Sequence, residues 1–156
     1  MIILGIDPSY TATGYAIIKK TGQQQQLIAY GQLKLPATQT MPERIGLFYN
    51  SIISIIQQCQ VTHICLETPF LGQNAQTFLK LGYLRGTLQL ICFQHKLHII
   101  EFSPREIKQT VTGYGNAPKD QVSRVIHMLF PTLTHQKSFD ISDAIAIALC
   151  GAWSIK

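Results

Sequence analysis

The sequence predicts an α/β protein built on a five-stranded mixed sheet, with helices on both faces of the sheet. Three observations lead to this fold class. The chain opens with three strand-like segments, it then changes to apolar spacings typical of helices, and two further short apolar strands alternate with those helices. The first three strands should form an antiparallel meander, and the last two should run parallel. Because no linker, repeat or change of composition divides the chain, residues 1–156 are expected to form one domain.

The strands are predicted from short apolar runs. The first run ends at Asp7, and the fourth ends at another acid, Glu67. Continuous apolar runs of this kind are typical of buried central strands. The polar connector between the second and third strands contains Gly22, and Gln23–Gln26 is expected to form the solvated tip of a hairpin. The five strands are expected at residues 1–6, 14–19, 27–35, 63–67 and 97–103.

The helices are predicted from apolar side chains that recur every three or four residues, such as Ile45, Phe48 and Ile52. Pro42 suits the first turn of the first helix. The second helix is apolar nearly all round and contains Gly82 and Gly86, a spacing that allows close approach between helices. We therefore expect it to supply a dimer interface. The helices are expected at residues 40–60, 74–95, 104–111, 118–130 and 139–155.

The composition is rich in hydrophobic residues, at 46%, and poor in charged ones, at 13%. This balance excludes a disordered or charge-laced helical protein. The 13 basic residues outnumber the 8 acidic ones, which points to a polyanionic partner. The start of the chain does not resemble a signal peptide, no apolar run is long enough to span a membrane, and the four cysteines form no close pair. We therefore expect free thiols and a cytoplasmic protein.

Four of the eight acids are candidates for a shared site. Asp7 and Glu67 each end a strand, and if these two strands are neighbours both acids lie at the same edge of the sheet. Asp140 and Asp143 are three residues apart at the start of an apolar helix, and they share one face of it. Four converging carboxylates repel one another unless a cation compensates their charge. Oxygen ligands suit Mg²⁺ or Mn²⁺, and two such ions are suited to phosphoryl transfer.

The loop that follows the first strand, residues 7–14, reads DPSYTATG. Small and hydroxyl residues in such a loop can present backbone N–H groups and hydroxyls to a phosphate. An ordinary tight turn before the second strand explains the same pattern. Both interpretations remain open on the sequence alone.

The chain contains, in order, the motifs GIDP and TGYAII, the strand-ending Glu67, and then KLGYLRG, KQTVTGYGNAPKDQV and DISDAIAIAL. Together these motifs resemble the bacterial RuvC family of Holliday-junction resolvases, over residues 2–150. The resemblance implies a ribonuclease H-like fold. It implies a homodimer that cuts four-way DNA junctions by paired symmetric nicks, with Mg²⁺ or Mn²⁺, alongside the RuvA–RuvB branch-migration complex.

The resemblance also implies roles for individual residues. Phe70 matches an aromatic residue that the family inserts at the junction centre. Two stretches depart from the family pattern: Ser9-Tyr10, where Gly-Ser is usual, and Thr68-Pro69. Some family members carry His at the position of Asp140. The positions that match catalytic carboxylates are Asp7, Glu67, Asp140 and Asp143, and those that match DNA contacts are Lys108 and Lys119.

Basic residues gather in two regions of the sequence with few acids between them, which favours contact with phosphates over a merely solvated face. Phe70 lies in a loop, where it is either tucked under the fold or serves as a wedge that stacks on an unpaired base. One basic group surrounds the loop at Gly113–Gly115, and the other is on the second helix. The candidate DNA contacts are Lys80, Arg85, Arg105, Lys108, Lys119 and Arg124.

Three functions are compatible with these patterns. The first is a metal-dependent, structure-specific endonuclease that leaves 5′-phosphate and 3′-hydroxyl ends. The second is a nucleotide-phosphate-binding domain of the actin and sugar-kinase kind, although such proteins need two lobes. The third is a non-catalytic DNA-binding module, which gives no reason for four converging acids. The first explains both the acids and the basic excess, and it is the function that we expect.

Overall fold

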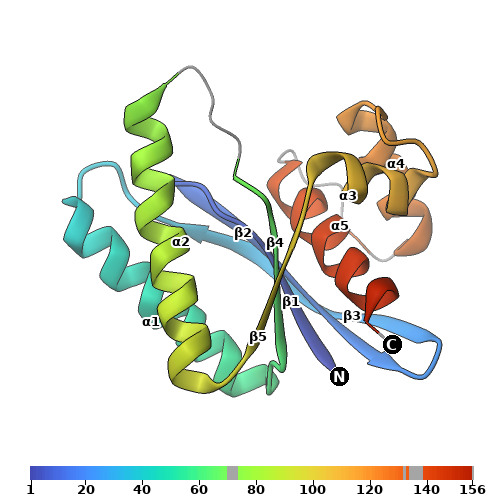
Figure 1. The fold of residues 1–156 in the computed structure, drawn as a ribbon, viewed down its shortest axis with the longest axis horizontal. Helices are drawn as coiled ribbons and strands as arrows, with labels where there is room; N and C mark the ends of the chain where they lie inside the picture. Colours follow the sequence, from blue (N-terminus) through green and yellow to red (C-terminus); the bar gives the residue numbers. More distant parts are fainter. Residues whose placement is uncertain (70–73, 132, 134–138, 156) are drawn as a thin grey trace.

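The computed structural model describes residues 1–69, 74–131, 133 and 139–155. They form a five-stranded sheet in the order β3-β2-β1-β4-β5 (Figure 1). β1 and β3 pair antiparallel with β2, whereas β4 is parallel to both β1 and β5. The predicted meander and the two parallel strands are therefore confirmed. The strands are β1 (Ile2–Asp7), β2 (Ala12–Thr21), β3 (Gln24–Lys34), β4 (His63–Glu67) and β5 (His98–Phe102).

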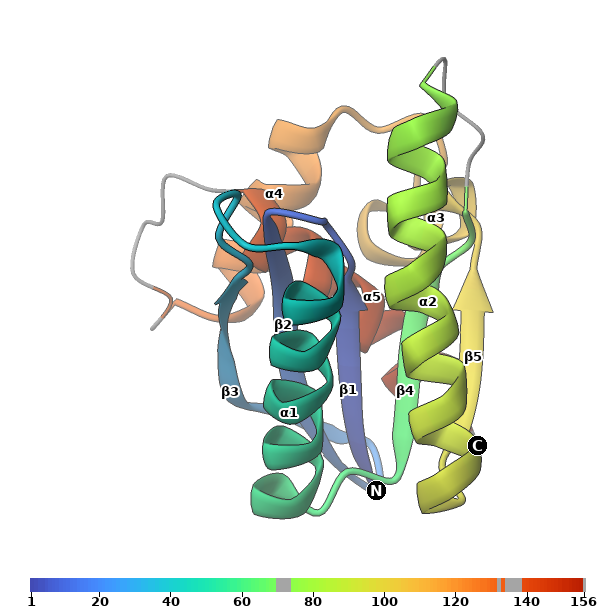
Figure 2. The ribbon, with the colours of Figure 1, turned by 90° about the vertical axis from the view of Figure 1, so that its left-hand side faces the viewer.

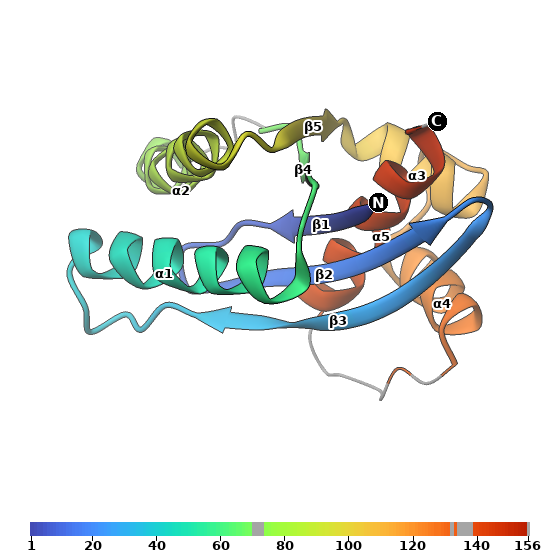
Figure 3. The same ribbon diagram turned by 90° about the horizontal axis from the view of Figure 1, so that it is seen from below.

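Helices cover both faces of the sheet, as predicted (Figures 2 and 3). α1 and α2 pack on one face, whereas α5 lies on the other with α3 and α4 packed over it. In the described part of the chain, no helix has the length and apolar character that a membrane crossing requires. The helices are α1 (Met41–Cys59), α2 (Ala75–His95), α3 (Pro104–Thr112), α4 (Lys119–Leu129) and α5 (Phe139–Ser154).

The helix starts are set by local hydrogen bonds that the sequence encodes. The carboxylate of Glu43 accepts a bond from the backbone N–H of Thr40 at 2.7 Å, and Glu106 does the same for Ser103 at 2.7 Å. The Asn74 side chain caps α2 by accepting two backbone N–H groups. Such caps satisfy donors that the first turn leaves without partners. Glu43 and Glu106 thus belong to helix caps, so neither acid needs a functional explanation.

The predicted hairpin tip is wrong in extent. Gln24–Gln26 are not loop residues, because they pair with Lys19–Thr21 and extend both strands. The turn itself is short, and Gly22 adopts a φ of +58°, a conformation that glycine accepts more easily than other residues. β3 is an edge strand, so its polar side chains can stay in contact with water when the strand pairs. A polar sequence was therefore compatible with a strand at this position.

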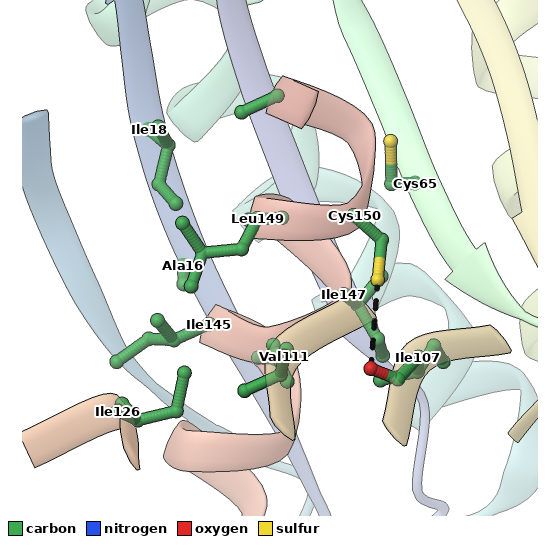
Figure 4. Close-up of a cluster of buried hydrophobic side chains, with 14 of the residues drawn as sticks. Ala16, Ile18, Cys65, Ile107, Val111, Ile126, Ile145, Ile147, Leu149 and Cys150 are labelled. Atoms are coloured by element: carbon green, nitrogen blue, oxygen red, sulfur yellow. Dashed lines mark hydrogen bonds between the residues drawn. The ribbon is translucent and has the colours of Figure 1, made fainter. Parts of the chain in front are cut away.

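Two hydrophobic cores lie on opposite faces of the sheet. In β1, Ile3 belongs to one core and Leu4 to the other, as the alternation of side chains along a strand requires. The core beneath α5 is shown in Figure 4, where Ile145 and Leu149 of this helix approach the strand residue Ala16. α5 is buried along most of its length, which explains its almost wholly apolar sequence.

Two glycines allow α5 to cross the sheet at close range. A Cβ atom on Gly5 of β1 would lie 2.3 Å from the carbonyl oxygen of Ala144. A Cβ atom on Gly14 of β2 would lie 2.2 Å from the carbonyl oxygen of Asp140. Both distances are far below van der Waals contact, so any larger residue would push the helix away. The glycines of the GIDP and TGY motifs therefore determine where the acidic start of α5 lies relative to Asp7.

Candidate active site

Asp7 and Glu67 lie at the same edge of the sheet, as the sequence predicted. β1 and β4 are parallel neighbours, and their last paired residues are Ile6 and Leu66. Each acid follows one of these residues directly. Because both strands run in the same direction, their carboxyl ends meet at one edge, where functional groups of open α/β sheets gather.

Asp143 joins these two acids from α5, which lies on the face of the sheet opposite to α1 and α2. It is in the first turns of α5, which Gly5 and Gly14 hold close to β1 and β2. The three carboxylates line one cleft of about 500 Å³, together with Lys119 from the start of α4. The opposite wall of this cleft is formed by α2, including Phe78 and Arg85. Residues from five elements, β1, β4, α2, α4 and α5, thus converge on one site.

The electrostatics of the cleft are dominated by uncompensated negative charge. Burial, followed by the charges of Asp143 and Glu67, raises the pKa of Asp7 to about 7. Burial and the charge of Asp143 likewise raise the pKa of Glu67. The Lys119 ammonium lies 3.0 Å from Oδ2 of Asp143, and this hydrogen bond raises the pKa of Lys119. Lysine charges offset only part of the charge of the three acids, and a further cation would be stabilised here.

Asp140, the fourth predicted acid, has a hydrogen-bond partner on β3. The Gln32 side chain, on β3, donates a hydrogen bond to Oδ2 of Asp140 at 2.6 Å. Asp140 does not line the acidic cleft, and its charge raises the pKa of Asp7 less than the charges of Asp143 and Glu67 do. The i, i+3 spacing correctly placed Asp140 near Asp143 on α5. It did not reveal that β3 offers Asp140 a partner of its own.

The loop between β1 and β2 is held together by its own hydrogen bonds. The hydroxyl of Thr13 donates to the carbonyl of Ser9 at 3.0 Å and accepts the Ser9 N–H at 3.2 Å. The buried Arg44 donates to the carbonyls of Tyr10 and Pro36. The bonds between Ser9 and Thr13 occupy an N–H and a hydroxyl that a phosphate-binding loop would present to its ligand. The structure therefore favours the tight-turn interpretation of this loop.

Two of the predicted DNA contacts flank the acids. Lys119 lies in the cleft itself. Lys108, on α3, lines an adjoining cleft of about 180 Å³ together with Glu67, Lys119 and Asp143. Its positive charge also acts to lower the pKa of Glu67. Lys108 and Lys119 therefore place positive charge next to the carboxylates, where a phosphate group would benefit from it.

The remaining predicted DNA contacts differ in their surroundings. The Lys80 ammonium lies 5.3 Å from the centre of the Tyr10 ring, a cation–π contact between α2 and the loop after β1. Arg124 is exposed and pairs with Asp120 at 3.1 Å. Arg105 lines a shallow depression on α3, away from the acidic cleft. Phe70 falls outside the described residues.

Arg85 differs most from its predicted role. Its side chain is only 12% exposed, and its guanidinium donates to the backbone carbonyl of Glu67 and to the carboxylate of Glu101. Glu101 on β5 is thus an ion-pair partner. No sequence pattern predicted this pair or the contact between Gln32 and Asp140. The residues of each pair are far apart along the chain, and neither pair belongs to a recognisable motif.

The donor set suits a hard divalent cation, since the three acids in the cleft offer only carboxylate oxygens. In the described residues, no three Asp, Glu, His or Cys side chains already form a ready-made ligand shell. That finding is compatible with Mg²⁺, which is commonly held by one or two carboxylates together with water and substrate phosphates. The excess of negative charge around Asp7 supplies the electrostatic reason for a cation to bind.

Comparisons with known proteins agree with this architecture. The family model for the crossover junction endodeoxyribonuclease RuvC matches residues 3–151. The RuvC protein of Chloroherpeton thalassium is 38% identical over 151 residues, which cover 97% of this chain and 81% of that protein. RuvC of Desulfitobacterium hafniense is 36% identical over 155 residues, covering 99% of this chain and 94% of that protein.

The fold of a solved relative is also similar. The structure of Thermus thermophilus RuvC in complex with a Holliday junction substrate superposes with a TM-score of 0.89, at 22% identity, covering 97% of this chain and 93% of that chain. This likeness confirms the ribonuclease H-like fold that the sequence motifs implied. With the family match over nearly its whole length, the chain belongs to the RuvC family of crossover junction endodeoxyribonucleases.

Proposed function

We propose that this protein is a metal-dependent endonuclease that resolves four-way DNA junctions during recombination and repair. The observation that carries the proposal is the convergence of Asp7, Glu67 and Asp143 in one cleft beside Lys119. A non-catalytic DNA-binding module has no use for buried carboxylates that repel one another. A nucleotide-binding domain would need its phosphate loop free, whereas Ser9 and Thr13 bond to each other. Family membership supports the nuclease.

Asp7, Glu67 and Asp143 would hold the metal, which we propose to be Mg²⁺ or Mn²⁺ with two ions per subunit. When bound, such ions activate water and stabilise charge on the attacking and leaving oxygens of a phosphodiester. The carboxylates contribute fixed negative charge in a partly buried cleft, and they need no proton transfer of their own. Asp140 would support the site from the adjoining turn of α5. The products would carry 5′-phosphate and 3′-hydroxyl ends.

The basic residues around the cleft would hold the DNA backbone. Lys108 and Lys119 are the strongest candidates, because they border the acids directly. Lys80, Arg105 and Arg124 would extend the contact along the surface, and Phe70 would enter the open centre of the junction. Contacts of this kind neutralise phosphates and release counterions, so binding should weaken steeply with salt.

The protein would act as a homodimer, with the exposed apolar side of α2 as the interface. Leu79, Tyr83, Leu90 and Phe93 are all exposed on this helix, and Phe93 is 83% exposed. A two-fold dimer presents two identical sites to a junction that has two-fold symmetry, which suits paired nicks. We place this dimer in the cytoplasm, where it would work with the RuvA–RuvB branch-migration complex.

A cleavage assay tests this function directly. A synthetic four-way junction and a linear duplex of the same sequence are incubated with the protein in Mg²⁺ or in EDTA. We expect paired nicks on opposite strands of the junction only, in Mg²⁺ only. Equal nicking of the duplex, or cleavage in EDTA, would reject a structure-specific, metal-dependent enzyme. Binding without cleavage, both in Mg²⁺ and in EDTA, would favour the non-catalytic module.

A further inference from the structure

Arg85 lies in the wall of the acidic cleft, but its charge is directed into the protein. One nitrogen of its guanidinium donates to the backbone oxygen of Glu67 at 2.7 Å, and the other donates to Oε1 of Glu101 at 2.5 Å. The first distance is typical of a charge-assisted hydrogen bond, and the second is shorter still. The Arg85 side chain is only 12% exposed, whereas that of Glu101 is 34% exposed and remains in contact with solvent.

The three residues come from three elements that meet at the carboxyl edge of the sheet. Arg85 is in the middle of α2, Glu67 is the last residue of β4, and Glu101 is in β5. The pairing of β1 with β4 ends at Leu66, and Pro8 on the β1 side has no N–H to donate. Arg85 thus supplies a donor to the Glu67 carbonyl just beyond the end of that ladder.

This arrangement differs from that of a residue that binds phosphate. The nearby carboxylate of Glu101 neutralises the guanidinium charge, so Arg85 adds little attraction for DNA. Its planar fork serves two acceptors that lie in different directions, which a lysine ammonium on a flexible chain does poorly. One of the two bonds goes to the backbone of Glu67, whose carboxylate lies in the cleft. The position of this carboxylate therefore depends on Arg85.

We propose that Arg85 is a positioning residue that locks the end of β4 to α2 and β5, and so holds the Glu67 carboxylate in the acid cluster. The proposal rests on the proposed nuclease function and adds to it a residue that contacts neither DNA nor metal. Fixing the peptide of Glu67 fixes the origin of its side chain. Thr68 and Pro69 follow directly, so the same bond determines where the chain leaves the sheet.

Four variants test this role. Arg85→Ala removes both bonds, and Arg85→Lys keeps the charge without the planar fork. Glu101→Gln removes the ionic partner, and Gln94→Ala is a control at the exposed far end of α2.

We expect the single-turnover cleavage rate of Arg85→Ala to fall about 10- to 100-fold. The Kd for the junction in EDTA should stay within about twofold. Mn²⁺ binding, measured by calorimetry without DNA, should weaken. Arg85→Lys and Glu101→Gln should lose less, and Gln94→Ala nothing.

Chemical rescue separates positioning from a general loss of structure. Added guanidinium ion should restore part of the cleavage rate of Arg85→Ala, because Arg85 borders a solvent-filled cleft. Urea at the same concentration, and sodium chloride at the same ionic strength, should not. A thermal unfolding curve of each variant shows whether the fold persists, and Arg85→Lys remains informative if Arg85→Ala does not fold.

The possible outcomes are distinct. Unchanged cleavage and unchanged Mn²⁺ affinity in Arg85→Ala would overturn the proposal. A junction Kd that weakens as much as the rate falls would also overturn it, since Arg85 would then contact DNA. If the unmodified protein cuts no junction, the proposed function fails, but the loss of Mn²⁺ affinity in Arg85→Ala still decides whether Arg85 positions Glu67.

Discussion

The ammonium of Lys119 lies 3.0 Å from a carboxylate oxygen of Asp143, at the centre of a cleft that also contains Asp7 and Glu67. The side chain of Lys119 is 69% exposed, whereas that of Asp143 is only 21% exposed. The lysine thus reaches from solvent into the acidic site and supplies positive charge there. A metal ion in the cleft would compete with this charge, and a DNA phosphate would attract it.

The first prediction concerns this lysine. In Lys119→Met the cleft loses its resident positive charge, so Mn²⁺ should bind the DNA-free protein about two- to fivefold more tightly, the range expected for one exposed ion pair. Junction binding should weaken, and the slope of log Kd against log salt should fall by about one. Calorimetry and a salt titration measure the two effects. Weaker Mn²⁺ binding would show that Lys119 supports the metal site instead of competing with it.

The second prediction concerns the charge of Asp7 in the absence of metal. Asn has nearly the same shape but no charge, so Asp7→Asn removes repulsion with Asp143 and Glu67 from a buried position. We expect this variant to be more stable than the unmodified protein in EDTA, by about 1–3 kcal/mol. Denaturant unfolding in EDTA measures the difference. The stabilisation that Mg²⁺ gives the unmodified protein should be reduced in the variant, and an unstable variant would contradict this account of the charge.

The third prediction concerns the contact between β1 and α5. A Cβ atom on Gly5 would lie 2.3 Å from a backbone oxygen of α5, so Gly5→Ala must displace the helix. We expect a loss of about 1–3 kcal/mol in the free energy of unfolding. Gly46→Ala is the matched control, because it is a helical glycine of α1 with open space around its Cβ position. That change should be neutral or stabilising by up to about 1 kcal/mol. Similar effects of the two changes would refute the steric account.

The fourth prediction concerns the apolar side of α2. Leu79 is 55% exposed, and a charge at this position would be buried without a partner in the proposed dimer. Leu79→Glu should therefore shift the protein to monomers in sedimentation experiments and uncouple the two nicks. Leu47→Glu on α1 is the control, since Leu47 is also exposed, at 39%, but lies on another helix. A Leu79→Glu protein that remains dimeric places the interface elsewhere.

The sequence predicted most of the fold because its patterns are local. The apolar run that ends at Asp7, the apolar spacing of α1 and Pro42 in its first turn each identify an element directly. The meeting of Asp7 and Glu67 depended on β1 and β4 being neighbours, and the structure shows that these strands pair in parallel. Only the extent of the hairpin was wrong, because polar residues on an edge strand look the same as a loop.

The site was predictable where it depends on strand ends and less so where it depends on tertiary packing. The contact between Gln32 and Asp140 requires the register of β3 and the angle at which α5 crosses the sheet. The bond from Arg85 to the Glu67 carbonyl requires the position of α2 over β4. Neither is encoded in a spacing along the chain. A positive charge in the sequence also cannot distinguish a residue that holds DNA from one that holds the protein together.

The most direct test of the central claim is cleavage of a synthetic four-way junction by Asp7→Asn in Mg²⁺, with junction binding measured on the same preparation. Asp7 lies in the cleft with Glu67 and Asp143, and burial together with the charges of these two acids raises its pKa to about 7. We predict that cleavage is abolished while the junction Kd is unchanged or slightly improved, because a negative charge near the DNA is gone. Cleavage retained by this variant would contradict the assignment of the acidic cleft as the active site.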